Sequence, residues 1–99
     1  MKIDKIVNGT EIQMALGGRL DTMTAPQLEE EINSCIGGAT KLDLDIAELD
    51  YVSSAGLRVL LSAQKIMNKQ GNMTIKNVKP DIMEIFDVTG FVDILNIEE

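Results

Sequence analysis

Three short segments of this chain alternate apolar and polar residues. Their apolar members are Ile12, Met14 and Leu16, then Leu42, Leu44 and Ile46, then Met73 and Ile75. A strand sends successive side chains to opposite faces, so each segment is predicted to be a β-strand with one apolar and one polar face. A parallel sheet covered on both faces would instead show continuous apolar runs. The pattern therefore predicts a sheet with helices mainly on one face and the other face largely open.

The first of these segments is also predicted to form a hairpin. Asn8-Gly9 stands between it and the apolar segment Ile3–Val7, and this dipeptide is a strong signal for a tight turn between two strands. Gly17-Gly18 follows the alternating residues and is expected to break the strand.

A helix is predicted to follow the hairpin, beginning near Thr24. Thr24 and Gln27 form a capping-box pattern, and Met23 with Leu28 could form a hydrophobic staple. Gly37-Gly38 is predicted to end this helix.

Two more helices and a last strand complete the expected order. The second helix is predicted from about Ala55 to Lys69, and a third, short helix follows Pro80 and ends at Gly90. Ile94–Ile97 is expected to be an edge strand. The order β-β-α-β-α-β-α-β predicts an α/β fold with a mixed sheet, and a length of 99 residues predicts one domain over 1–99.

Composition excludes several classes of function. A net charge of −7 provides no electrostatic footprint for nucleic acid or an anionic membrane. No stretch is long enough to span a bilayer, and the N-terminus lacks the apolar run of a signal peptide. The lone Cys35 suits a reducing compartment and is expected to be a buried, inert thiol. We therefore expect a cytoplasmic protein.

Enzyme signatures are absent from the sequence. The chain has no histidine, which excludes Ser-His-Asp and Cys-His chemistry, and it has no Cys/His cluster for zinc and no phosphate-binding P-loop motif. Asp43 and Asp45 share one face of a predicted strand, where solvation accounts for them best. We expect no enzymatic activity, no cofactor and no metal.

Two adjacent serines mark the junction between the second alternating strand and the second helix. Serine is favoured at a helix N-cap because its oxygen accepts a backbone N–H. A phosphate on a serine at this position would suit the positive end of the helix dipole and would be displayed on the surface. From the residues alone, the alternative is a capped helix with no further role.

Three blocks of the sequence resemble the anti-sigma factor antagonists of the STAS-domain family. Val52-Ser53-Ser54-Ala55-Gly56-Leu57 fits the family signature without a gap, although Ser53 replaces the usual Asp and Ala55 the second Ser or Thr. The other blocks are Gly18-Arg19-Leu20-Asp21-Thr22-Met23-Thr24-Ala25-Pro26-Gln27-Leu28 and Ile85-Phe86-Asp87-Val88-Thr89-Gly90-Phe91.

This resemblance implies a STAS fold and a binding switch. In the family, the unphosphorylated domain binds an anti-sigma factor, typically a serine kinase, and so frees a sigma factor for transcription. The kinase then phosphorylates a serine, which corresponds to Ser54 here, and a phosphatase resets the switch. The alternative that stays open is a STAS domain that binds a nucleotide or another small ligand within a larger signalling or transport assembly.

The residues expected to contact the partner surround this serine. They are Asp21, Ser53, Ser54, Gly56 and Arg58. Asp21 follows a strand end, where loops of α/β folds gather, so we expect it near Ser54; starting a turn is the alternative role. Arg58 lies one helical turn beyond Ser54 and could reach a phosphate there. With Ser62, Lys65 and Lys69 it forms a basic stripe, for which a solvated face and a docking edge are the two readings.

Overall fold

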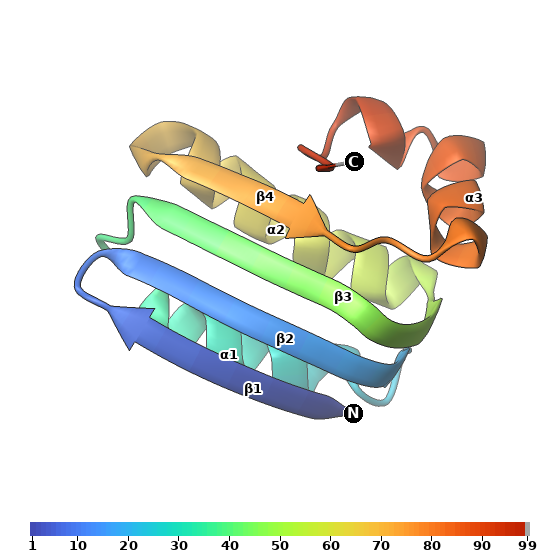
Figure 1. Ribbon diagram of the computed structural model, residues 1–99, viewed down its shortest axis with the longest axis horizontal. Helices are drawn as coiled ribbons and strands as arrows, with labels where there is room; N and C mark the ends of the chain where they lie inside the picture. Colours follow the sequence, from blue (N-terminus) through green and yellow to red (C-terminus); the bar gives the residue numbers. More distant parts are fainter. Residues whose placement is uncertain (99) are drawn as a thin grey trace.

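The computed structural model describes residues 1–98, built around a four-stranded sheet in the order β1-β2-β3-β4. In Figure 1, α1 and α2 lie behind the sheet and α3 lies at one end. The elements are β1 (Lys2–Asn8), β2 (Glu11–Leu20), α1 (Ala25–Cys35), β3 (Lys41–Val52), α2 (Ser54–Gln70), β4 (Asn72–Lys76), α3 (Pro80–Thr89) and a short 3-10 helix, η1 (Phe91–Asp93). This confirms the predicted α/β architecture with helices on one face.

Strand pairing makes the sheet mixed. β1 and β2 form the predicted antiparallel hairpin, whereas β2, β3 and β4 run parallel. The prediction that Gly17-Gly18 breaks the first long strand is wrong, because β2 continues to Leu20. Its register against β3 shifts on either side of this pair, between Ala15 and Gly17 and between Gly18 and Arg19. Pairing with β3 thus allows β2 to continue through an irregularity at which local propensity alone predicts the end of the strand.

The core lies between the sheet and the helices behind it. The apolar residues of the alternating segments are buried, as predicted, and each is at most 1% exposed: Ile12, Met14, Leu16, Leu42, Leu44, Ile46, Met73 and Ile75. Leu28 and Ile32 of α1 and Leu60 and Met67 of α2 pack into the same core. Cys35, expected to be buried, is half-buried instead because it is the last residue of α1, at the rim of the core.

The start of α1 differs from the predicted capping box. Thr24 is the N-cap, but its side chain makes no capping hydrogen bond. Its hydroxyl instead donates to the backbone oxygen of Arg19 at 2.7 Å and accepts from the N–H of Asp21 at 2.8 Å. Met23 is 86% exposed, so the predicted staple is absent as well. The Thr24 hydroxyl does not cap α1 because backbone groups of the preceding loop lie within hydrogen-bonding reach of it.

The C-terminal part agrees with prediction up to Gly90. This residue ends α3 in the left-handed conformation, with φ +79°, which glycine adopts without steric cost. The predicted edge strand at Ile94–Ile97 is reduced to one isolated bridge between Ile97 and Ile75. The short helix η1 ends just before this segment. Two backbone hydrogen bonds, of 2.9 and 2.8 Å, join the segment to β4, and both involve Ile75.

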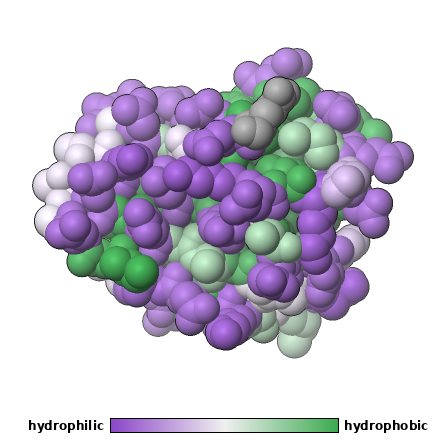
Figure 2. All heavy atoms as spheres, viewed as in Figure 1, coloured by the Kyte–Doolittle hydropathy of each residue, from purple (hydrophilic) through white to green (hydrophobic). Residues whose placement is uncertain are grey.

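Polar residues cover most of the sheet face that α1 and α2 leave open (Figure 2). The expectation that Asp43 and Asp45 are both solvated is wrong for Asp43, which is 5% exposed, whereas Asp45 is half-buried. Gln13 and Thr74 flank Asp43 in direct register on the neighbouring strands, and the Lys76 ammonium lies 3.4 Å from its Oδ2. Side chains on a central strand are thus covered by their cross-strand neighbours even on an open face.

Candidate functional site

β2 and β3 end side by side, at the right-hand end of the sheet in Figure 1. Leu20 and Val52 are partners in the parallel register, and the N–H of Ser53 donates to the backbone oxygen of Leu20 at 2.8 Å. The loop that starts at Asp21 and the helix that starts at Ser54 therefore leave the sheet from adjacent strand ends. The structure brings these two predicted segments together, as expected for loops at the carboxyl ends of parallel strands.

The two serines occupy different environments. Ser53 is the N-cap of α2 in an extended conformation, and its hydroxyl oxygen accepts from the N–H of Gly56 at 3.3 Å. Ser54 is the first residue of α2 and is exposed. Ser53 performs the capping, and the exposed side chain of Ser54 lies at the helix start, where the helix dipole stabilises a negative charge.

Gly56 lies buried beneath the two serines. A Cβ atom added at this position would lie 2.6 Å from Cγ of Leu20, closer than real Cβ contacts come. The first turn of α2 can therefore rest directly on the end of β2 only because this residue lacks a side chain. Gly56 thus determines how closely the start of α2, which carries Ser54, approaches the end of β2.

Asp21 organises the loop between β2 and α1. Its Oδ1 accepts from the N–H groups of Met23 and Thr24 at 3.0 and 3.1 Å and lies 3.2 Å from the Thr24 hydroxyl. Desolvation alone would raise the pKa of this carboxyl, but these hydrogen bonds and the Arg19 guanidinium outweigh it, so the pKa is lowered from its ordinary value. Asp21 is therefore a charged anchor that holds the loop beside Ser54.

Two contacts that the sequence pattern did not indicate lie at the border of the site. The Arg19 guanidinium lies 4.3 Å from the ring centroid of Tyr51, its register partner on β3, and its Nε is 3.6 Å from Oδ2 of Asp21. The Lys79 ammonium pairs with Oδ1 of Asp50 at 2.8 Å and so joins the start of α3 to the end of β3. A basic residue two positions before Asp21 was the available signal for the first contact, but its aromatic partner depends on strand register.

Arg58 lies on the exposed side of α2, one turn after Ser54. It lines a shallow hollow of about 200 Å³ between the starts of α1 and α2, together with Thr22, Pro26 and Glu29. The other members of the predicted basic stripe, Ser62, Lys65 and Lys69, are also exposed. Their exposure suits a solvated face and a docking edge equally.

Within residues 1–98, no helix combines the length and apolar character needed to cross a membrane. The same part of the chain contains no group of three or more Cys, Asp or Glu side chains arranged to hold a metal ion.

Comparisons with known proteins agree on one family. The family model for the STAS domain matches residues 2–99. BtrV of Bordetella bronchiseptica, named as a candidate anti-sigma factor antagonist, is 40% identical over 81 residues, which cover 80% of this chain and 70% of BtrV. The anti-sigma-B factor antagonist of Bacillus subtilis is 29% identical over 98 residues, covering 98% of this chain and 90% of that protein.

Solved structures show the same fold. An anti-sigma factor antagonist from Mycobacterium paratuberculosis aligns with a TM-score of 0.86 and 18% identity, covering 97% of this chain and 83% of that one. The antagonist SpoIIAA in its unphosphorylated form aligns with a TM-score of 0.77 and 18% identity, covering 99% and 88%. The match over nearly the whole chain, the mixed sheet and the strand-to-helix junction at Ser53-Ser54 lead to one conclusion: this chain belongs to the STAS domain family, in which its relatives are anti-sigma factor antagonists.

Proposed function

We propose that this chain is an anti-sigma factor antagonist whose binding is switched off by phosphorylation of Ser54. Unphosphorylated, it binds an anti-sigma factor that is a serine kinase, and a sigma factor is released. The kinase then phosphorylates Ser54, the complex separates, and a phosphoserine phosphatase resets the switch. The chain acts as a binding protein rather than an enzyme, in the cytoplasm. The observation that carries this proposal is the exposed hydroxyl of Ser54 on the first residue of α2, in the register of the family signature.

The physical step is a local change of charge. Phosphorylation adds roughly −1.5 to −2 charges at pH 7. An interface shaped for a neutral hydroxyl disfavours this charge, whereas an anion at the N-terminus of α2 stabilises the helix by about 0.3–1 kcal/mol. The switch therefore needs no large refolding.

The proposed contact surface surrounds Ser54. Asp21 anchors one side of it, Ser53 holds the helix start, and Arg58 lies one turn along α2. Gly56 supports this surface from below. Ser53 stands where the family usually has Asp, so this surface has one negative charge fewer, and we propose that this difference affects which kinase recognises it.

Substitutions of Ser54 test the switch. Ser54→Ala keeps a small neutral surface and should bind the anti-sigma factor like the wild type, but resist release by ATP. Ser54→Asp adds one negative charge at the contact and should bind more weakly, by about tenfold or more, since 1.4 kcal/mol corresponds to a factor of ten. Titration calorimetry against the cognate anti-sigma factor measures the affinity of each variant. Peptide mapping after incubation with the kinase and ATP should place the phosphate on Ser54.

Ser34→Asp is the matched control for charge. Ser34 is exposed in the last turn of α1, about 14 Å along that helix from its first residue, Ala25, and a surface charge is screened over about 8–10 Å. This variant should therefore bind as the wild type does. Equal affinities for the wild type, Ser54→Ala and Ser54→Asp would place Ser54 outside the interface. Saturable nucleotide binding without phosphate transfer would then favour the ligand-binding alternative.

A further inference from the structure

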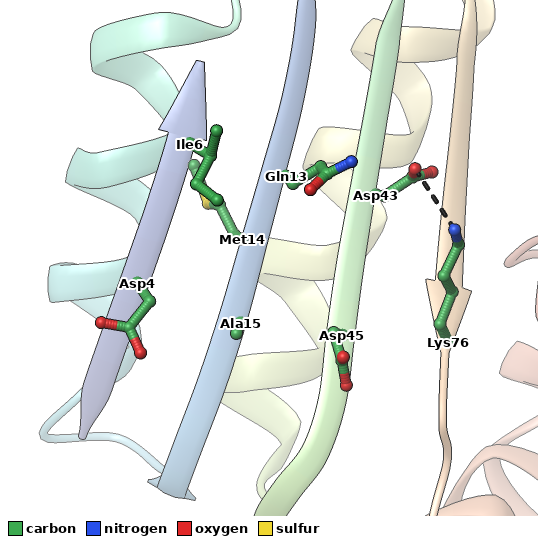
Figure 3. Close-up of a pocket in the computed structure, with 8 residues that line it drawn as sticks. All are labelled: Asp4, Ile6, Gln13, Met14, Ala15, Asp43, Asp45 and Lys76. Carbon is green, nitrogen blue, oxygen red and sulfur yellow. Dashed lines mark ion pairs between the residues drawn. The ribbon is translucent and has the colours of Figure 1, made fainter. Parts of the chain in front are cut away.

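The basic stripe of α2 differs from the other basic residues of the chain because its charges have no internal partner. The chain contains nine lysine and arginine residues. Six of them lie within 4.0 Å of an acidic side chain: Lys2, Lys5, Arg19, Lys41, Lys76 and Lys79. Lys76, for example, reaches toward Asp43 in Figure 3, and 3.4 Å separate its ammonium from Oδ2. The remaining three, Arg58, Lys65 and Lys69, all lie on α2 and form no ion pair within residues 1–98.

The surroundings of α2 leave these three charges available to a partner. The helix (Ser54–Gln70) contains no aspartate or glutamate, so no carboxylate one helical turn away pairs with them. Glu29 of α1 lines the same hollow as Arg58, but the two side chains form no ion pair in the part of the chain that the structure describes. The chain as a whole has 16 acidic residues and a net charge of −7. The basic stripe is therefore a local positive surface on an acidic protein.

The basic stripe continues a line of exposed residues that begins at Ser54. Its members follow Ser54 at intervals of three or four residues, so all of them lie along one side of α2. They are Arg58, Ser62, Lys65 and Lys69. At a rise of about 1.5 Å per residue, Lys69 lies about 22 Å along the helix from Ser54. A partner that covers Ser54 and extends along α2 therefore meets positive charges over this distance.

We propose that the basic stripe docks an acidic surface of the anti-sigma factor, alongside the contact at Ser54. This inference rests on the function proposed above and adds to it the charge of the partner surface. Complementary charges at the edge of an interface steer the encounter and fix the orientation of the two proteins. A nucleic acid fits this surface less well, because a phosphate backbone that runs past the stripe meets the acidic remainder of the chain.

Charge reversal at the far end of the stripe tests the docking without altering the Ser54 site. Lys65 and Lys69 lie about 16 and 22 Å along α2 from Ser54, beyond the screening length of about 8–10 Å. Lys65→Glu and Lys69→Glu should each slow association with the cognate anti-sigma factor by about threefold or more, and their combination by about tenfold. Lys65→Arg keeps the charge and should associate as the wild type does. Surface plasmon resonance measures these rates, and circular dichroism checks that each variant is folded.

Lys2→Glu is the matched control. It changes the net charge by the same amount as either stripe variant, but on β1, where the ion pair of Lys2 with Asp4 is exposed and contributes little to stability. Its association rate should equal that of the wild type. An equal slowing in Lys2→Glu would indicate general repulsion between acidic proteins and would overturn the proposal. Wild-type rates in both Lys65→Glu and Lys69→Glu would overturn it as well.

The same measurements separate this docking from the switch at Ser54. If ATP releases the wild type and both stripe variants alike and their association rates are equal, the switch stands and only the docking is wrong. If the wild type does not bind the anti-sigma factor, the proposed function fails and the docking fails with it. Binding of a short DNA duplex that Lys65→Glu and Lys69→Glu abolish, with unchanged association to the anti-sigma factor, would assign the stripe to a nucleic acid and overturn the proposal.

Discussion

At Gly56, a missing side chain decides how closely α2 approaches β2. The position is buried, and an added Cβ would lie 2.6 Å from Cγ and 3.0 Å from Cδ2 of Leu20, with the Leu20 backbone oxygen at 3.1 Å. The leucine side chain could shift to relieve part of this overlap, but Leu20 is itself 0% exposed and has little space to move into. The requirement for glycine here is therefore one of packing, independent of any partner.

We expect Gly56→Ala to lower the free energy of unfolding by about 1–3 kcal/mol, the usual cost of overpacking a buried site. Urea denaturation followed by circular dichroism measures this change. Gly37→Ala is the matched control, because a Cβ at Gly37 would meet nothing within 4 Å. The control should change stability by less than about 1 kcal/mol. Equal stability for the wild type and Gly56→Ala would mean that Leu20 moves aside freely.

At the scale of elements, α2 separates its structural serine from its candidate functional one. Ser53 caps the helix through the N–H of Gly56, while Ser54 begins the helix with an exposed side chain. A change at Ser53 should therefore act mainly on stability and a change at Ser54 mainly on binding. The first turn of α2 has no acidic residue, so no side-chain charge there offsets the positive end of the helix dipole.

Removing the cap should destabilise the protein. Ser53→Ala should lower the free energy of unfolding by about 0.5–2 kcal/mol, towards the lower end because the capping distance is a long 3.3 Å. Ser54→Ala should change it by less than about 0.5 kcal/mol, as for other exposed positions. Thermal and urea denaturation of the two variants provide the comparison. A larger loss in Ser54→Ala than in Ser53→Ala would reverse the assignment of the two serines.

At the scale of the whole molecule, the sheet and its helices pack around one buried core. Ser54 lies outside the core that holds these elements together. A negative charge there also falls at the favourable end of the α2 dipole.

Phosphorylation at Ser54 should therefore leave the fold intact. We expect the helical circular dichroism signal to be unchanged and the melting temperature of the phosphorylated protein to be equal to or above that of the unmodified protein. Both forms should be measured at about 0.15 M salt, where the Debye length is about 8 Å, because this salt screens the repulsion that arises from the net charge of −7. A clear loss of helicity on phosphorylation would mean that the modification acts by unfolding.

Several features could be predicted from the sequence because they depend on near neighbours along the chain. Alternation identified the buried faces of β2, β3 and β4, and Asn8-Gly9 identified the hairpin. A serine as the cap of α2 and Gly90 as the end of α3 follow from backbone groups within a few positions. The resemblance of three sequence blocks to one family also needed no coordinates, and the comparisons confirm it.

Only the tertiary structure decided which residues meet across strands and loops. Thr24 bonds back to Arg19 instead of capping α1, Arg19 stacks on Tyr51, and Asp43 is buried among its neighbours on an open face. Each outcome depends on strand register and on the path of a loop, and a shift of one residue would bring different side chains together. The contacts around Ser54 belong to this second class, because their members come from separate strands and helices that only folding brings together.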